Sequence, residues 1–296
     1  AVLHAGRPPH QEQKKITPYF GRVERFSPLF STIFCIMKTV LITGACINTG
    51  VDIVHKFASE GYNVVFTGRD PEKVSAAQSK YEAQFPNVKI LGYAINSLVD
   101  ERTVDEQAVE VLFEDLDEKG IFAETLVLNA ADQGLGIKIF ENPLTDFMKV
   151  INTNVVWNYF MVEHAGKRMK EHGGGNIVFV NSNTAYRAIP DRVAYVASKG
   201  GQLGMMRALA LDLGKYNIRV NAVLPGMIKT DRWEKNPDFY AKVPSRFTPI
   251  GDVAVGADIA DAVYHFAAHA RNTTGAELTV DGGNMIQLYP IVPEEK

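Results

Sequence analysis

Cysteine is scarce in this sequence, and neither sign of charge predominates. Only two of the 296 residues are cysteines, Cys35 and Cys46, which excludes a disulfide framework of the kind found in secreted domains, so we expect a cytoplasmic protein. Lysine and arginine total 31 against 34 aspartates and glutamates, a net charge of −3 that argues against nucleic acid as a partner. No apolar run reaches the roughly 20 residues of a membrane-spanning helix, so we expect no membrane partner either.

Metal-binding patterns are missing too. The histidines, among them His164, His172, His265 and His269, follow no metal-ligand spacing, and we expect no catalytic metal. What remains is an ordinary globular composition, with 46% hydrophobic and 22% charged residues. The length is sufficient for one large domain with a substantial core.

Residues 1–36 differ from the rest of the sequence. They carry five basic and two acidic side chains, four prolines and no helical or strand periodicity, whereas Met37 leads directly into an apolar run. We interpret Met37 as the natural start and expect residues 1–36 to be disordered, and either vector-derived or translated from upstream of that start. The alternative is a transit peptide, because the segment contains arginine and few acidic residues.

Residues 37–296 alternate between short apolar runs and longer segments with helical spacing. The runs contain few charges and are bounded by Gly, Asn or Pro, as is typical of strands buried on both faces. The helical segments include Val51–Ser59, Leu144–Glu171 and Tyr195–Lys215, and no linker interrupts the pattern. This alternation predicts a single α/β domain over residues 37–296, with a doubly wound, seven-stranded parallel sheet and helices on both faces, which is a Rossmann fold. The expected strands are Thr39–Thr43, Asn63–Thr67, Val88–Tyr93, Thr125–Leu128, Asn176–Asn181, Arg219–Leu224 and Glu277–Val280.

A glycine-rich turn, TGACINTG, follows the first expected strand and leads into a helix. A strand, a tight turn and a helix N-terminus in this order present backbone N–H groups to a pyrophosphate, which predicts a dinucleotide site. Asn48 stands where a second closely approaching glycine is usual, and asparagine tolerates positive φ better than most residues. The alternative is a purely structural turn. The residues expected to contact the cofactor here are Gly44, Ile47, Asn48 and Gly50.

The second expected strand ends at Gly68-Arg69, where an NAD site usually has an acidic residue for the ribose 2′-hydroxyl. An arginine can instead bind a 2′-phosphate with two donors, so we expect NADP, with NAD less favoured. Asp70 is explained by an N-cap role, because Pro71 and Glu72 follow it as in a helix start. The alternative is that Arg69 is a solvated loop residue.

Tyr195 and Lys199 have the spacing YxxxK, and on a helix residues four apart share a face. Ser182 lies just past a buried strand, where parallel sheets bind their ligands. A tyrosine phenol has a pKa near 10, and a nearby ammonium lowers it toward the range useful for acid–base catalysis. Ser182 can polarise a substrate oxygen by hydrogen bonding. Each residue taken singly is better explained by a structural role, so the prediction depends on their joint occurrence.

From Met37 to about Gly283 the chain resembles the short-chain dehydrogenase/reductase family. The glycine turn resembles the family's TGxxxGxG motif, and Ser182, Tyr195 and Lys199 occupy the positions of its catalytic serine, tyrosine and lysine. Asn154 matches the asparagine that, in the family, anchors a water connecting the lysine to solvent. The resemblance further implies cofactor contacts from Asn129, Ala130, Pro225, Gly226, Ile228 and Thr230, and from Tyr195 and Lys199 themselves.

The chain matches the family pattern at the expected catalytic residues but departs from it at three other places. Asn48 replaces a glycine, Ala131 replaces the glycine of the NNAG motif, and the usual adenine-binding aspartate is missing, so that Asn96 is the expected substitute. These changes affect the expected cofactor contacts. They leave the expected proton-transfer residues in place.

The resemblance implies a proton relay from Tyr195 through a ribose hydroxyl and Lys199 to the water at Asn154. It also implies a homo-oligomer, a tetramer or a dimer. Substrate specificity is expected in a lid around residues 229–251, whose aromatic side chains suit an apolar or ring-bearing substrate. The alternative is that these aromatic side chains pack on the body of the protein.

Together these features predict an NADP-dependent oxidoreductase that interconverts a small-molecule alcohol and a ketone or aldehyde by hydride transfer, with Tyr195 as general acid/base. One alternative is a redox-neutral enzyme of the same fold, such as an epimerase. The other is a non-catalytic nucleotide-binding protein, which the changes at Asn48, Ala131 and the adenine position leave open.

Overall fold

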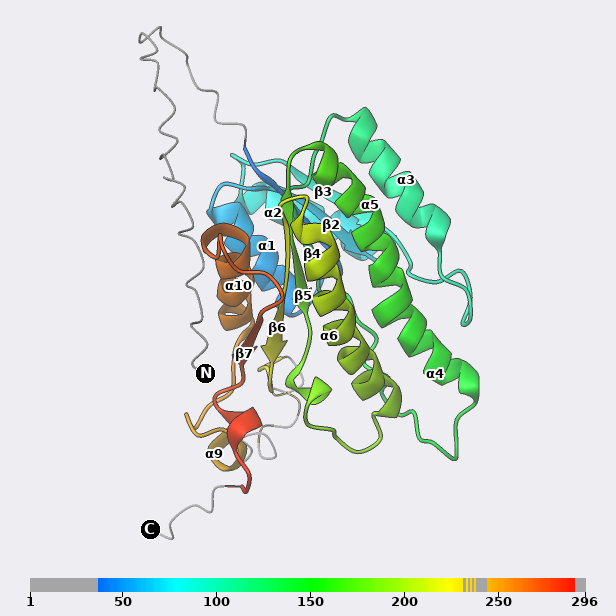
Figure 1. The fold of residues 1–296 in the computed structure, drawn as a ribbon, viewed down its shortest axis with the longest axis vertical. Coiled ribbons are helices and arrows are strands. Elements are labelled where there is room, and N and C mark those ends of the chain that lie inside the picture. Colours follow the sequence, from blue (N-terminus) through cyan, green and yellow to red (C-terminus); the bar gives the residue numbers. More distant parts are fainter. Residues whose placement is uncertain (1–36, 231–232, 234, 236, 238–243, 291–296) are drawn as a thin grey trace, which may run out of the picture. The chain divides into compact units, whose positions relative to one another are not determined.

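The computed structural model describes residues 37–230, 233, 235, 237 and 244–290. Their seven strands are β1 (Thr39–Ile42), β2 (Asn63–Gly68), β3 (Ile90–Ala94), β4 (Thr125–Leu128), β5 (Gly175–Val180), β6 (Ile218–Pro225) and β7 (Glu277–Val280). They form one sheet in the order β3-β2-β1-β4-β5-β6-β7, in which every neighbouring pair is parallel (Figure 1). The predicted residues 1–36 extension lies outside the described residues, and so does part of the predicted lid.

Helices join the strands and cover both faces of the sheet. They are α1 (Thr49–Ser59), α2 (Pro71–Gln84), α3 (Glu106–Glu118), α4 (Leu144–Ile151), α5 (Trp157–Glu171), α6 (Val193–Gly214), the short α9 (Pro244–Phe247) and α10 (Gly256–Tyr264). The predicted doubly wound, seven-stranded α/β fold is therefore confirmed. None of the helices in the described ranges is long and apolar enough to cross a membrane.

Successive strand residues point to opposite faces, which divides the core into two layers. On β1, Val40 and Ile42 pack with residues of α1, α2 and α10, whereas Leu41 packs with residues of α3, α5 and α6. All three side chains are fully buried. Figure 1 shows this division, with α1 beside α10 and α5 beside α6. Burial on both faces explains why the strand sequences are continuous apolar runs.

The predicted helix over Leu144–Glu171 is a single path broken by a π-helical turn, η1 (Asn152–Val156), between α4 and α5. A π-turn adds one residue to the helical repeat and frequently marks a functional site. Helical spacing in the sequence does not reveal such a turn. Here it lies around the buried Asn154.

The predicted start of α2 is confirmed. The Asp70 side chain accepts hydrogen bonds from the N–H groups of Glu72 (3.0 Å) and Lys73 (3.3 Å), and Pro71 is the first helical residue. Asp70 thus satisfies two of the otherwise unpaired amides of this helix.

Candidate active site

The predicted site residues gather at the carboxyl edge of the sheet. All seven strands are parallel, so the segments that follow them emerge at the same edge. The chain passes from β1 outward to β2 and β3 and then returns to β4 beside β1, which makes the β1–β4 gap the switch point where such sheets bind ligands. The glycine-rich turn follows β1, and Asn129 and Ala130 follow β4 across this gap.

A dense set of hydrogen bonds fixes the glycine-rich turn. Thr43 Oγ1 accepts from the N–H groups of Asn129 and Ala130, each at 3.0 Å, and Asn129 Nδ2 donates to the carbonyls of Thr43 (3.1 Å) and Gly44 (2.9 Å). Tyr81, fully buried on α2, donates from its hydroxyl to the carbonyl of Ala45 at 2.7 Å. Asn129 therefore binds the two sides of the switch point together.

Gly44 and Gly50 are required by close approaches. Gly44 has φ +69°, and a Cβ there would lie 2.9 Å from Ala130. A Cβ on Gly50 would lie 2.3 Å from the Gly44 carbonyl oxygen. Both positions admit only glycine without rearrangement of the turn.

Asn48 takes the backbone conformation that the glycine pattern predicts. It has φ 51° and ψ −142°, which side chains rarely adopt and which costs about 1–3 kcal/mol. Asn48 precedes α1 as its N-cap residue, and its side chain makes no capping hydrogen bond. The first-turn N–H groups of α1 therefore have no side-chain acceptor, in contrast to those of α2. They can donate hydrogen bonds to a bound anion.

At the end of β2, cations and a carboxylate surround Cys46. Arg69 is exposed, and its side chain makes no ion pair or hydrogen bond within the described part of the chain. The charges of Asp70 and Lys73 both act on Cys46, whose pKa is raised by burial and by Asp70 and lowered by Lys73. Asp70 caps the start of α2 and also forms an ion pair with Lys73 at 3.8 Å. A guanidinium without a partner among the described residues and a helix N-terminus without a side-chain cap are groups that can bind phosphate.

Other predicted cofactor residues lie at the same edge with differing exposure. Ile47 is 62% exposed. Asn96 is exposed after β3. Pro225 ends β6, and the N–H of Gly226 donates to the carbonyl of Val280 at 3.0 Å. Ile228 forms a parallel bridge with Ala254, and Thr230 accepts from the N–H of Trp233 at 2.8 Å.

Ser182 follows β5 and is oriented by Thr184. Its Oγ accepts hydrogen bonds from Thr184 N–H (3.2 Å) and Thr184 O–H (2.9 Å). A serine hydroxyl has two acceptor positions and one proton to donate. With both acceptor positions taken, the Ser182 proton is available to Tyr195, to which Ser182 is hydrogen bonded. The same proton can reach a substrate oxygen placed between them.

Tyr195 and Lys199 lie one turn apart on α6, and the Lys199 ammonium is 5.6 Å from the centre of the Tyr195 ring. Burial raises the pKa of Tyr195, while the hydrogen bond with Ser182 and the charge of Arg192 act in the opposite direction. Burial also lowers the pKa of Lys199 from 10.5 to about 7. From the sequence we expect a lowered pKa for Tyr195. In the structure of the protein alone, the pKa is raised, because desolvation outweighs the effects that lower it.

Asn154 is fully buried in η1, and its side chain forms hydrogen bonds to Asp132 and Ser198. Its Oδ1 accepts from the N–H of Asp132 (2.7 Å), and its Nδ2 donates to the Asp132 carbonyl (2.8 Å) and to Ser198 Oγ (2.9 Å). These bonds join the loop after β4 to α6. Asn154 is thereby held against α6, the helix that carries Tyr195 and Lys199.

Sequence reasoning missed several residues that build this site. Thr184 orients Ser182, Tyr81 holds the turn, and Gln202 contacts both Lys199 and Asn154. Gln202 could have been predicted from the sequence, because it is a polar residue three positions after Lys199 and so lies on the same face of the helix. Among the described residues, no group of three or more His, Cys, Asp or Glu side chains is placed to hold a metal ion.

Comparison with known proteins agrees with this geometry. A family model described as enoyl-(acyl carrier protein) reductase matches residues 44–284. A 3alpha-hydroxysteroid dehydrogenase of Mediterraneibacter gnavus is 32% identical over 246 residues, covering 83% of this chain and 96% of that protein. An L-rhamnose 1-dehydrogenase (NAD(P)(+)) of Azotobacter vinelandii is 33% identical over 263 residues, covering 85% and 98%.

Among solved structures, L-sorbose reductase from Gluconobacter frateurii, complexed with NADPH and L-sorbose, superimposes with a TM-score of 0.77 at 25% identity, covering 85% of this chain and 98% of that one. The chain belongs to the short-chain dehydrogenase/reductase family. Its relatives are dehydrogenases and reductases acting on CH–OH or carbonyl groups, which makes this chain an NAD(P)-dependent oxidoreductase of that family.

Proposed function

We propose that this protein is an NADP-dependent oxidoreductase that interconverts an alcohol with a ketone or aldehyde, with Tyr195 as its general acid/base. The proposal rests on one observation: Ser182, Tyr195 and Lys199 lie at the same edge of the sheet as the glycine-rich turn, which can bind an anion. The bound nicotinamide cofactor supplies the hydride in reduction and accepts it in oxidation. The chain's own residues supply the proton and the orientation.

Ser182 donates a hydrogen bond from its hydroxyl to the substrate oxygen and so polarises the carbonyl bond, keeping its own proton. Tyr195 delivers a proton to that oxygen in reduction and takes it back in oxidation. Because burial raises the pKa of Tyr195, the phenol is protonated at neutral pH, which is the form that reduction needs. Oxidation needs the phenolate, and a charged Lys199 on the same helical face favours it. Lys199 changes charge near pH 7, so the oxidative rate should depend on pH in this range.

The preference for NADP rests on Arg69. Its side chain has no partner within the described residues, while Asp70, the acidic alternative, caps α2. Lys73, on the first turn of α2, forms an ion pair with Asp70 at 3.8 Å, so the preference is assigned to Arg69 alone. The complex of L-sorbose reductase with NADPH shows that a protein of similar fold takes this cofactor.

Cofactor titration tests the proposal. We expect the wild type to bind NADPH at least tenfold more tightly than NADH. Arg69→Ser should weaken NADPH binding about 10–100-fold, the effect of losing about 1.5–3 kcal/mol of charge-assisted hydrogen bonding. NADH binding should change less than twofold. The control is Arg271→Ser, an exposed arginine that precedes β7 at the opposite edge of the sheet. A preference for NADH would overturn the NADP assignment, and binding of neither would overturn the oxidoreductase proposal.

For the substrate, we propose an apolar or ring-bearing carbonyl compound. The predicted lid, residues 229–251, is described only in part. Within it Trp233 donates from Nε1 to the carbonyl of Ile228 at 3.1 Å, which holds the indole against the segment after β6. A panel of cyclic and linear ketones with NADPH tests this, and faster turnover of small linear ketones would contradict it.

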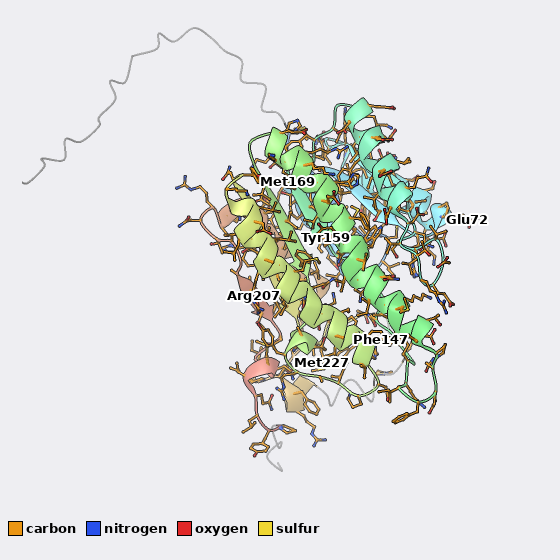
Figure 2. The ribbon with its side chains drawn as sticks, turned by 45° about the vertical axis from the view of Figure 1, so that its right-hand side comes forward. Glu72, Phe147, Tyr159, Met169, Arg207 and Met227 are labelled. Atoms are coloured by element: carbon orange, nitrogen blue, oxygen red, sulfur yellow. The ribbon has the colours of Figure 1, made fainter. Side chains whose placement is uncertain are left out.

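We further propose that the protein is a cytoplasmic homo-oligomer, a tetramer or a dimer. Figure 2 shows α5 and α6 side by side on one face, with Tyr159 on α5 and Arg207 on α6. On these helices Tyr159 is 49% and Leu211 85% exposed, apolar surface that a second copy can cover. Sedimentation should give a dimer or tetramer for the wild type and a smaller species for Tyr159→Glu. A monomeric wild type would contradict the proposal.

A further inference from the structure

Gln202 lies at the centre of a buried polar network beside the proton-transfer residues. It is 1% exposed on α6, three residues after Lys199. Its Oε1 accepts from Lys199 Nζ (3.2 Å) and Asn181 Nδ2 (3.0 Å), and its Nε2 donates to the backbone carbonyl of Asn154 (2.6 Å). With the amide flipped, its NH2 group would face the Lys199 and Asn181 donors, and its oxygen would face the Asn154 carbonyl oxygen. Only one orientation therefore satisfies all three bonds.

The same network occupies the Asn154 carbonyl. That oxygen accepts from Gln202 Nε2 at 2.6 Å and from Asn158 Nδ2 at 2.8 Å. A carbonyl oxygen has two lone pairs, and both are used. The backbone carbonyl of Asn154 therefore has both lone pairs occupied by side-chain amides. The Gln202 amide joins this carbonyl directly to Lys199.

Lys199 is fixed by two neutral oxygens. Its ammonium donates to the carbonyl of Val180 at 3.0 Å and to Gln202 Oε1 at 3.2 Å. An ammonium has three donors, so one N–H remains beyond these two bonds, and Nζ lies 5.6 Å from the centre of the Tyr195 ring. Each hydrogen bond that the ammonium donates favours its charged form, which burial disfavours.

We propose that Gln202 is a positioning residue for proton transfer, which holds the Lys199 ammonium beside Tyr195 and joins it to the Asn154 backbone. This inference rests on the proposed function, because it assigns a role in the Tyr195 reaction. An amide neither gains nor loses a proton near neutral pH. Gln202 therefore orients Lys199 without relaying its proton, and Lys199 exchanges protons on the side of Tyr195.

Among the residues that the structure describes, few charged or titratable groups lie near Lys199. On α6 they are Tyr195 and, at the start of the helix, Arg192. Strand β5 contributes the Val180 carbonyl and the neutral Asn181 that follows it, and η1 and α5 contribute neutral amides. Burial is the cause of the lowered Lys199 pKa. A substitution at Gln202 should therefore change the pKa of Lys199 directly.

The test compares two amides that bind the same carbonyl, of which only Gln202 also contacts Lys199. In protein labelled with carbon-13 at the lysine ε position, the Lys199 signal is identified by its loss in Lys199→Met. We expect Gln202→Leu to lower the midpoint of the Lys199 titration by about one pH unit. Gln202→Glu, which brings a carboxylate to the ammonium, should raise it. Asn158→Leu should leave it within about 0.3 of the wild-type value, although it costs stability.

Turnover provides the second readout. The pH at which kcat for alcohol oxidation is half-maximal should rise in Gln202→Leu and stay at the wild-type value in Asn158→Leu. Equal effects of the two leucine variants, or no shift of the titration in either Gln202 variant, would overturn the proposal. A shifted titration with an unchanged kcat profile would also overturn it. Absence of any carbonyl turnover in the wild type would instead contradict the proposed function, since the titration is measured on the cofactor-free protein.

Discussion

Replacing Lys199 by methionine should make the protein more stable while removing its oxidoreductase activity. Lys199 is 2% exposed, and burial lowers its pKa from 10.5 to about 7. At about 1.4 kcal/mol for each pH unit, holding this ammonium in the core costs about 5 kcal/mol. Methionine has a similar length and carries no charge, so it removes this cost.

The gain is reduced by the acceptors that lose a donor. The Val180 carbonyl and Gln202 Oε1 both bind the ammonium. Leaving buried acceptors without that donor costs about 1–3 kcal/mol, so the net gain at pH 6 should be about 2–4 kcal/mol.

The gain should also depend on pH, with a sign that follows from proton binding. Between about pH 7 and 10.5 the unfolded wild type keeps a proton on Lys199 that the folded protein has released. Stability of the wild type therefore rises with pH across this window, relative to a variant without the group. The advantage of Lys199→Met should be full below pH 7 and lost by about pH 10.

Urea unfolding at pH 6, 8 and 10, followed by the fluorescence of the buried Trp157, measures these differences. Protein concentration is held fixed, because an oligomer's stability depends on it. The control is Lys89→Met, the same substitution at an exposed lysine. A Lys199→Met variant less stable than wild type at pH 6, or a difference constant from pH 6 to 10, would refute the reasoning.

Two substitutions around the glycine-rich turn should change stability in opposite directions. Asn48→Gly should raise the free energy of unfolding by about 1 kcal/mol, because it relieves a strained backbone at φ 51° and ψ −142°, and a loss in urea titrations would show that no strain is stored there. Tyr81→Phe should lower the free energy of unfolding by about 1–3 kcal/mol, because the buried carbonyl of Ala45 loses its 2.7 Å hydrogen bond. It should also weaken NADPH binding, and an unchanged urea midpoint would contradict this account.

The sheet could be predicted because parallel strands buried on both faces have a strong sequence pattern. The expected strands agree with the structure to within one or two residues, for example Thr125–Leu128, and Asn176–Asn181 against Gly175–Val180. The end of each strand then located the site, since all strands end at one edge. Positive φ at Asn48 could likewise be expected from its position among the glycines.

The buried connections of the site could not be predicted in the same way. Helical spacing cannot reveal a π-turn, and the bond from Gln202 to Asn154 joins residues 48 positions apart. The balance between burial and charge at Tyr195 also depends on packing that spacing does not define. Charge reasoning alone predicted a lowered pKa for Tyr195, whereas desolvation reverses the direction.

The central claim, that Tyr195 transfers the proton in an NADP-dependent carbonyl reaction, is tested most directly by Tyr195→Phe. Turnover of the best carbonyl substrate is followed by the absorbance of NADPH, and NADPH binding is titrated separately on the same protein. The account predicts a loss of kcat of about 10²–10⁴-fold, typical of a missing general acid, with a dissociation constant for NADPH within twofold of wild type. Turnover at the wild-type rate in Tyr195→Phe would contradict it.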